Sequence, residues 1–177
     1  MEANKIIITG GGARIGAAIA KNLSGPSVEI VIHYNKSKNN AEKLKKKLSE
    51  NGTKIYLIKG DLSKKKDLKK IIQFSKNKLK YFDCLINNAS LFENDNLLNF
   101  SNKSWDMHLN TNLKAPAYLS KEFSKNIGKS KNPNIINIID QRVFKLTPFF
   151  FSYTLSKTGL FTLTKTSAMT LAPKIRV

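Results

Sequence analysis

The sequence of 177 residues has one cysteine, Cys84, so a disulfide bond within the chain is excluded. Cys84 lies in the apolar run 82–86, and we expect a buried structural thiol there. Apolar runs long enough to span a bilayer are absent. The first residues lead directly into an expected strand at residue 5, which does not fit the pattern of a signal peptide. We therefore expect a cytoplasmic protein that does not associate with membranes.

Histidines are also scarce, since the chain has only two, His33 and His108. Neither has a partner at the spacing of a metal site, and no metal is expected. Ser152 and Ser156 flank Tyr153, but no His–Asp pair accompanies them, so we assign no hydrolase triad. Both histidines are interpreted as structural residues.

Acidic residues are few, because 12 Asp and Glu stand against 31 Lys and Arg, which gives a formal net charge of +19. Such a balance can indicate binding to nucleic acid or to a membrane surface. Most lysines, however, fall in runs such as 43–48 and 64–70, between apolar residues at helical spacing. Ala41, Leu44 and Leu48 form the apolar stripe of one such helix. We interpret the charge as solvated helix faces and expect no nucleic-acid partner, while a role in attracting polyanionic ligands stays open.

Predicted strands and helices alternate along the whole chain. The expected strands cover residues 5–9, 28–33, 54–59, 82–87 and 134–140, and the expected helices cover 14–24, 38–50, 64–79, 103–126 and 151–171. Pro116 should bend the fourth helix. This order predicts one α/β domain, a three-layer α/β/α sandwich in which helices cover both faces of a parallel sheet.

A glycine-rich turn follows the first expected strand. It reads Thr9-Gly10-Gly11-Gly12-Ala13-Arg14-Ile15-Gly16. A turn of this kind, placed between a strand and a helix, lets backbone N–H groups approach a pyrophosphate at the helix N-terminus. An ordinary flexible turn is the alternative, and the strand–turn–helix context favours the phosphate-binding interpretation.

Tyr153 and Lys157 are four residues apart at the start of the last expected helix. Residues at this spacing lie on one face of a helix, so both side chains can point into the same cleft. A neighbouring ammonium favours the ionised phenol and lowers its pKa. The pair therefore predicts a tyrosine that acts as an acid near neutral pH.

Together these motifs resemble the short-chain dehydrogenase/reductase family. The resemblance rests on the glycine turn 9–16, on Asn87-Asn88-Ala89, on Asn112 and on the Tyr153/Lys157 pair, in the family's order and spacing. It covers essentially the whole chain and implies a single NAD(P)-binding Rossmann domain over residues 1–177. Residues 172–177 look like the beginning of a sixth strand, whereas family members continue through a substrate-covering loop and a seventh strand. The fold is therefore expected to be incomplete at its C-terminal side.

Within the family, the chain is most similar to the pteridine reductases. Arg14 stands where most members have glycine, and Asp140 occupies the place of the usual catalytic serine. Ser90, followed by Phe92, replaces the common glycine after Asn-Asn-Ala. The second strand ends in the segment 33–37, which contains no acidic residue.

The absence of a carboxylate in the segment 33–37 predicts the cofactor. An NAD site places Asp or Glu here to bind the ribose 2′-hydroxyl, whereas a 2′-phosphate needs cations and donors, which Lys36 and Ser37 can supply. NADPH is therefore expected, and a surface turn without a ligand is the alternative. The resemblance implies the following cofactor-binding residues: Gly10, Arg14, Ile15, Gly16, His33, Tyr34, Asn35, Lys36, Ser37, Asp61, Leu62, Asn88, Ala89, Ser90, Tyr153 and Lys157.

The resemblance also implies the catalytic residues, which are Asn112, Asp140, Tyr153 and Lys157. Tyr153 would donate the proton, Lys157 would lower the phenol's pKa and hold the nicotinamide ribose, and Asn112 would hold a water of the proton relay. A carboxylate such as Asp140 can share a proton with tyrosine and relay it to a ring nitrogen, which fits reduction of a C=N bond. The alternatives are an Asp that caps the turn after the fifth strand and a solvated Asn112 in mid-helix.

The expected substrate contacts are Arg14, Ser90, Phe92, Asp140 and Tyr153. Phe92 would stack on a flat heteroaromatic ring and Arg14 would offer several donors. The alternatives are a loop aromatic that covers the core and an arginine that points to solvent. Trp105 and the run Phe149–Phe151 are interpreted as packing or interface residues.

The sequence thus predicts an NADPH-dependent reductase of a pteridine-like substrate, such as a dihydropterin or dihydrofolate. A carbonyl reductase of the same family, acting on 3-oxoacyl thioesters or another ketone, is the first alternative. A non-catalytic NADP-binding or nucleic-acid-binding protein is the second. The resemblance further implies a homo-oligomer, a tetramer formed through the fourth and fifth helices.

Overall fold

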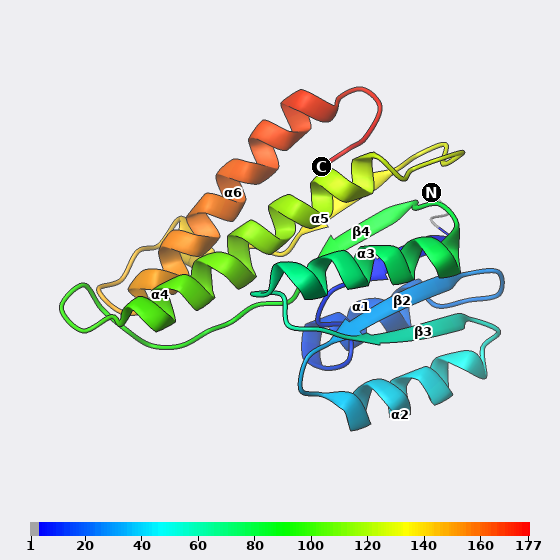
Figure 1. Cartoon of the computed structure of the whole chain (residues 1–177), viewed down its shortest axis with the longest axis horizontal. Helices are drawn as coiled ribbons and strands as arrows, with labels where there is room; N and C mark the ends of the chain where they lie inside the picture. Colours follow the sequence, from blue (N-terminus) through cyan, green and yellow to red (C-terminus); the bar gives the residue numbers. More distant parts are fainter. Residues whose placement is uncertain (1–3) are drawn as a thin grey trace.

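The computed structural model describes residues 4–177, which form a parallel five-stranded sheet in the order β3-β2-β1-β4-β5 (Figure 1). The strands are β1 Lys5–Ile8, β2 Glu29–Tyr34, β3 Lys54–Lys59, β4 Cys84–Asn87 and β5 Asn134–Asn137. Each pair of neighbouring strands is parallel, as the alternating pattern predicts. The first three residues, part of the segment expected to lead directly into a strand, lie outside the described range.

Helices cover both faces of this sheet (Figure 1). They are α1 Arg14–Leu23, α2 Lys38–Ser49, α3 Lys65–Leu79, α4 Asn102–Leu109, the wide-turn segment η1 Asn110–Lys114, α5 Ala115–Ser124, the short segment η2 Gln141–Val143 and α6 Phe151–Leu171. The predicted three-layer α/β/α architecture is confirmed. Within residues 4–177, no helix has the length and apolar character needed to cross a bilayer.

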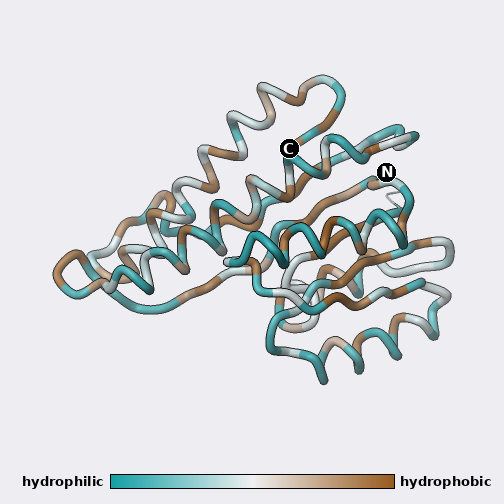
Figure 2. The backbone as a smooth tube through the Cα atoms, viewed as in Figure 1, coloured by the Kyte–Doolittle hydropathy of each residue, from teal (hydrophilic) through white to brown (hydrophobic). Residues whose placement is uncertain are grey.

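The sheet has a hydrophobic core on each face. Because side chains alternate along a strand, Ile7 faces α3 and α5, whereas Ile6 and Ile8 face α1 and α2. All three isoleucines are fully buried. Burial on both faces explains why the strands read as continuous apolar runs, which Figure 2 shows as brown segments at the centre of the fold.

The lysine-rich helices have the amphipathic structure that the sequence predicts. In α2 the buried residues are Ala41, Leu44 and Leu48, and the lysines between them are exposed. In Figure 2 the backbone tubes of α2 and α3 are largely teal, with brown residues at intervals. The apolar stripe therefore accounts for how α2 packs on the sheet, and its lysines lie on the solvent face.

Most elements differ from their predicted bounds by one or two residues, and two differ more. The helix expected at 103–126 begins at Asn102, passes through the wide turn η1 and continues as α5, with Pro116 in the first turn of α5. The strand expected to run to Asp140 ends at Asn137, beyond which Ile138 N still donates to Asn87 O at 3.0 Å. Near the other end of the chain, Arg176 forms a parallel bridge with Asn134, which agrees with the expected start of a sixth strand.

Gly16 provides a test of how closely α1 packs against the glycine turn and β4. A Cβ added to Gly16 would lie 2.4 Å from Gly10 O and 2.6 Å from the Asn88 Nδ2 atom. We predict that Gly16→Ala lowers the free energy of unfolding by about 1–3 kcal/mol because of this overlap, although alanine is the better helix former. Urea denaturation followed by circular dichroism measures the change.

Gly25→Ala is the matched control, because a Cβ at Gly25 would meet nothing within 4 Å. Its free energy of unfolding should stay within about 0.5 kcal/mol of wild type. Equal stability of the two variants would show that the close approach at Gly16 is not a constraint.

Candidate active site

The candidate site lies at the carboxyl ends of the strands, where parallel α/β sheets bind their ligands. The glycine turn leaves β1 there, residues 88–92 leave β4 and residues 138–140 leave β5. The first turns of α6 stand beside them and carry Tyr153 and Lys157. The topology thus brings together residues that are far apart in the sequence, such as Gly10 and Tyr153, which are about 140 positions apart.

The glycine turn is tied to both neighbouring strands. Gly10 has a φ of 62°, and its amide donates to His33 Nδ1 at 3.2 Å. On the other side, Asn88 Nδ2 donates to Thr9 O at 2.9 Å and to Gly10 O at 3.2 Å. Thr9 Oγ1 accepts the amides of Asn88 and Ala89 at 3.0 and 3.1 Å. The turn that the sequence assigns to phosphate binding is therefore held rigidly from two sides.

The His33 side chain bonds to the glycine turn. Its side chain is 2% exposed, and its Nε2 lies 3.0 Å from Gly60 O while Nδ1 accepts the Gly10 amide. Burial lowers the pKa of His33, so the ring is neutral and Nε2 carries its proton. His33 therefore uses both ring nitrogens within the protein, as the structural interpretation predicts, and its place among the cofactor-binding residues stays a prediction.

The start of α1 offers unpaired backbone donors. In the described chain, its first turn contains no acidic residue, and Ala13 at the N-cap provides no side-chain hydrogen bond. Arg14 and Ile15 are exposed at this end of the helix, and Arg14 has a φ of 51°. An uncapped helix N-terminus has a partial positive charge and can accept an anion.

The remaining predicted cofactor residues line the same edge of the sheet. Asn35 and Lys36 are exposed after β2, and Ser37 Oγ lies 3.1 Å from the position that a Cβ on Gly12 would take. Asp61 follows β3 and accepts Ser63 N at 3.0 Å and Ser63 Oγ at 2.7 Å. Tyr34 and Leu62 are buried, so their side chains belong to the core and only their backbone is available at the edge.

Tyr153, Asp140 and Lys157 come together as the sequence predicts. The Tyr153 phenol donates to Asp140 Oδ2 at 2.8 Å, and the Lys157 ammonium lies 5.8 Å from the centre of the tyrosine ring. Lys157 Nζ donates to Ile138 O at 2.7 Å. Tyr153 and Lys157 are 5% and 3% exposed. The three groups form one compact unit at the end of β5.

The electrostatics of this unit differ from the prediction that Lys157 lowers the phenol's pKa. Burial raises the pKa of Tyr153, and the hydrogen bond and negative charge of Asp140 raise it further. Burial lowers the pKa of Lys157 to about 8. Burial also acts to raise the pKa of Asp140, but the hydrogen bonds from Arg142 N and Tyr153 and the charges of Arg142 and Lys157 outweigh it and lower that pKa. The carboxylate, rather than the ammonium, is thus the main partner of the phenol.

Asp140 caps a turn and also accepts the hydroxyl of the predicted proton donor. Its Oδ1 accepts Arg142 N at 2.9 Å, so the residue caps the segment η2, while its Oδ2 accepts the Tyr153 phenol. The capping interpretation and the catalytic interpretation therefore do not exclude each other.

Asn112 is fully buried in η1, and its side chain joins two parts of the site. Its Oδ1 accepts Leu91 N at 2.8 Å, and its Nδ2 donates to Leu91 O at 3.0 Å and to Ser156 Oγ at 3.0 Å. Ser90 Oγ lies 3.3 Å from the same Oδ1. The alternative of a solvated Asn112 is wrong, because these contacts clamp the segment after β4 to α6.

Phe92 and Phe150 form an aromatic wall beside the Tyr153 phenol. Phe92 is 51% exposed, lies parallel to Phe150 at 4.4 Å between ring centres, and meets the Tyr153 ring edge-on at 4.7 Å. The Arg142 guanidinium lies 4.5 Å from the centre of the Phe150 ring. The exposure of Phe92 argues against the alternative that it covers the core.

Sequence reasoning missed Arg142 and interpreted Phe150 only as a packing or interface residue. Both lie in the connection 141–150, which has no periodicity that would orient its side chains. The available signal was the position of Arg142, two residues after Asp140, where a capped turn returns the chain towards the carboxylate. Trp105 instead packs with Phe100 and Phe151, as the packing interpretation predicts.

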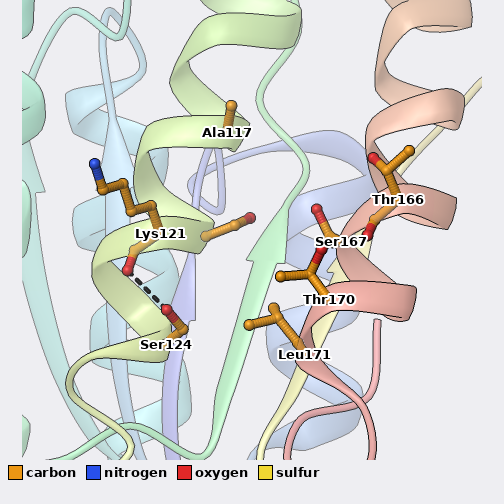
Figure 3. Close-up of a pocket in the computed structure, with 8 residues that line it drawn as sticks. Ala117, Lys121, Ser124, Thr166, Ser167, Thr170 and Leu171 are labelled. Atoms are coloured by element: carbon orange, nitrogen blue, oxygen red, sulfur yellow. Dashed lines mark hydrogen bonds between the residues drawn. The ribbon is translucent and has the colours of Figure 1, made fainter.

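Two open hollows in the structure lie away from these residues. Figure 3 shows one of about 280 Å³ between α5 and α6, with polar and small side chains on both helices. Its lining residues are Ala117, Ser120, Lys121, Ser124, Thr166, Ser167, Thr170 and Leu171. The other, of about 440 Å³, lies at the opposite end of the sheet and includes Tyr81 and Asp83. Neither contains a predicted catalytic side chain. Across residues 4–177, no group of three His, Cys, Asp or Glu side chains is arranged to hold a metal.

Comparison with known proteins identifies related chains. A family model described as short chain dehydrogenase matches residues 4–177. The 3-oxoacyl-[acyl-carrier-protein] reductase FabG of Buchnera aphidicola is 31% identical over 168 residues, which cover 95% of this chain and 67% of that protein. The corresponding FabG of Staphylococcus epidermidis is 26% identical over 168 residues, covering 95% of this chain and 69% of that protein.

Solved structures agree closely with this fold. FolM Alternative dihydrofolate reductase 1 from Brucella canis, complexed with NADP, superposes with a TM-score of 0.90 at 37% identity. The match covers 97% of this chain and 70% of that chain. A short chain dehydrogenase from Burkholderia cenocepacia, in complex with NADP, gives a TM-score of 0.92 at 25% identity, covering 98% of this chain and 71% of the other.

The Asn112 clamp predicts a loss of stability on mutation. Asn112→Ala would leave the amide and carbonyl of Leu91 without their side-chain partner, and a buried polar group without a hydrogen bond costs about 1–3 kcal/mol. We expect the free energy of unfolding to fall by that amount in urea denaturation. Asn22→Ala is the control, since Asn22 is exposed and bonds only within its own helix. A stability of Asn112→Ala equal to that of the control would refute the clamp.

Proposed function

The chain belongs to the short-chain dehydrogenase/reductase family, and on this basis we propose that it is an NADPH-dependent reductase of pteridine-like substrates, with Tyr153 as the proton donor. The observation that carries this proposal is the 2.8 Å hydrogen bond from the Tyr153 phenol to the Asp140 carboxylate. It combines the proton donor of a reductase with a carboxylate that can relay a proton to nitrogen.

The residues at the glycine turn fit NADPH. The uncapped N-terminus of α1 and the turn at Gly10 offer backbone donors to a pyrophosphate. At the end of β2, Ser37 lies close to this turn and follows the exposed Lys36, and no carboxylate in the segment 33–37 would repel a 2′-phosphate. The solved relatives from Brucella and Burkholderia contain NADP, which supports the same cofactor here. When bound, the cofactor supplies a hydride.

The Tyr153–Asp140 pair holds the proton that the reduction requires. Addition of hydride to a C=N bond leaves negative charge on nitrogen, which must be protonated. The raised pKa of the phenol keeps Tyr153 protonated at neutral pH, and the adjacent carboxylate can accept or return a proton as the phenol turns towards the substrate. Lys157, whose pKa is about 8, is largely protonated at pH 7 and offsets the charge of Asp140.

The site also offers a surface for a flat substrate. The exposed ring of Phe92 stands edge-to-face with Tyr153, so a heteroaromatic ring stacked on Phe92 would lie within reach of the phenol. Ser90 is exposed, and a hydrogen bond from its side chain acts to lower the pKa of Tyr153. Arg14 is exposed at the start of α1. These positions agree with the proposed substrate contacts. Cytoplasmic location and a tetramer through α4–α5 and α6 stay predictions.

A carbonyl reductase is the second candidate, supported by the similarity to FabG proteins. Reduction of a ketone places negative charge on oxygen, and the ionised Asp140 beside Tyr153 would oppose it, whereas a serine hydroxyl would stabilise it by a hydrogen bond. The structure of the pair therefore favours the pteridine-like substrate over the ketone.

Tyr153→Phe tests the proposed mechanism. Loss of NADPH absorbance is followed after mixing protein, NADPH and a dihydropterin. We expect kcat to fall about 100-fold or more because general acid catalysis is lost, while the Kd for NADPH, measured by fluorescence titration, changes little. Tyr81→Phe, at the opposite end of the sheet, should retain the wild-type rate. Undiminished pterin turnover by Tyr153→Phe would refute the mechanism.

Asp140→Ser separates the two candidate functions. If the carboxylate relays a proton to nitrogen, this variant should lose about 100-fold in turnover of dihydropterin and gain turnover of a 3-oxoacyl thioester. Asp106→Ser, on the exposed face of α4, controls for the loss of a negative charge. Wild-type protein that reduces the thioester and ignores the dihydropterin would favour the carbonyl reductase.

A further inference from the structure

Arg142, in the short segment η2, contacts the carboxylate of Asp140, which accepts the Tyr153 phenol. We infer that Arg142 is a positioning residue that fixes the orientation of the Asp140 carboxylate and orders the aromatic wall beside the phenol. This inference rests on the proposed function, because it assigns Arg142 a part in the same proton transfer. It concerns a residue that does not itself touch the reacting atoms.

The two oxygens of Asp140 are divided between two partners. Oδ1 accepts the backbone amide of Arg142 at 2.9 Å and lies 3.7 Å from the Arg142 Nη1 atom. Oδ2 accepts the phenol of Tyr153 at 2.8 Å. Because Arg142 engages Oδ1 with both its backbone and its side chain, rotation of the carboxylate away from the phenol would break two interactions. The orientation of Oδ2 therefore depends on Arg142.

The guanidinium is itself held by aromatic rings. Its central carbon lies 4.5 Å from the centre of the Phe150 ring and 5.3 Å from that of Phe92. Phe92 stacks on Phe150 and meets Tyr153 edge-on, so Arg142, the two phenylalanines and the phenol form a continuous series of contacts. A guanidinium that stacks in this way is planar and always charged, and lysine cannot reproduce both properties.

The backbone of Phe150 is adapted to this arrangement. Phe150 has a φ of 58°, in the left-handed region that a bulky residue rarely occupies. Its amide donates to Asn94 Oδ1 at 3.3 Å, and Ser152 N donates to the buried Asp95 at 3.0 Å. The residues after β4 thus hold the start of α6 in the conformation that turns the Phe150 ring towards Arg142.

The position of Arg142 has an energetic cost. Its Nε is buried and makes no hydrogen bond with any part of the described chain. An unpaired buried donor is unfavourable, and native structures keep such groups where another role compensates. The ion pair with Asp140 and the stack on Phe150 supply that role. Arg142 and Lys157 are also the cations whose charges lower the pKa of Asp140.

The variants Arg142→Met and Arg142→Lys test the inference with dihydropterin and NADPH. We expect Arg142→Met to lower kcat about 10- to 100-fold through misorientation of the carboxylate, with the Kd for NADPH unchanged within about twofold. The acidic limb of the pH profile of kcat/KM should move to higher pH, because a cation next to Asp140 is lost. Arg142→Lys keeps the charge without the planar stack, so its kcat should fall between those of wild type and Arg142→Met.

Lys145→Met is the matched control, since it removes one positive charge from the same connection at an exposed position. It should retain the kcat and the pH profile of wild type. If Lys145→Met moved the profile as far as Arg142→Met does, the effect would be one of general charge and the inference would fail. Unchanged kcat and unchanged pH profile in both Arg142 variants would also overturn it.

A second measurement does not depend on turnover. Carbon-13 NMR of protein labelled at aspartate follows the titration of the Asp140 carboxyl, whose pKa should rise in Arg142→Met and stay near the wild-type value in Arg142→Lys. If wild-type protein fails to reduce dihydropterin, the proposed function fails while this titration still decides the role of Arg142. An unaltered Asp140 titration in Arg142→Met refutes the positioning role even if pterin is reduced.

If Arg142→Met does not fold, the kcat and the near-UV circular dichroism of Arg142→Lys test the positioning role instead. Wild-type values for both measurements refute that role.

Discussion

Burial of the sheet on both faces is the constraint from which the rest of the structure follows. Since helices cover both faces, the strands are apolar throughout, and polar chemistry is confined to the edge where the strands end. The glycine turn after β1, Asn88 after β4 and Asp140 after β5 all lie at this edge. Each is fixed by hydrogen bonds to a neighbouring segment rather than by the core. The site is thus assembled from strand ends whose relative positions the parallel pairing determines.

Hydrogen bonds of side-chain amides hold this edge together. Asn88 joins β4 to the glycine turn, and Asn112 joins the segment after β4 to α6 through Leu91 and Ser156. Asn112 reaches its partners from the wide turn η1, which interrupts the helical pattern between α4 and α5. An irregular turn in mid-helix is a common feature of functional sites. Here it points a fully buried amide towards Leu91 and towards Ser156, which lies three residues after Tyr153.

The sequence predicted the architecture well, because apolar runs and glycine turns report directly on buried strands and on their connections. It also brought Asp140, Tyr153 and Lys157 to one place, since helical spacing and the end of a strand define those positions. It gave the wrong direction for the pKa of Tyr153. Burial of the phenol raises that pKa first, and the Asp140 carboxylate in hydrogen-bond contact raises it further, whereas the Lys157 ammonium bonds to Ile138 O. Arg142 was missed, and Phe150 was not placed beside the phenol, because the connection 141–150 has no repeat that would orient its side chains. The clamp of Asn112 needs a contact 21 residues away along the chain.

The imidazole beneath the glycine turn has a consequence for how the turn responds to acid. His33 accepts the Gly10 amide at Nδ1, and Nε2 carries the proton that is donated to Gly60 O. A second proton would have to bind Nδ1. Nδ1 could then no longer accept the Gly10 amide, because both groups would be donors. Burial lowers the pKa of His33, so the folded state binds this proton less readily than the unfolded state, and its contribution to stability is lost as pH falls below the ordinary histidine range. Protonation of this one ring would therefore break the side-chain bond between the glycine turn and β2, and the backbone bond from Gly11 N to His33 O would be left to join them.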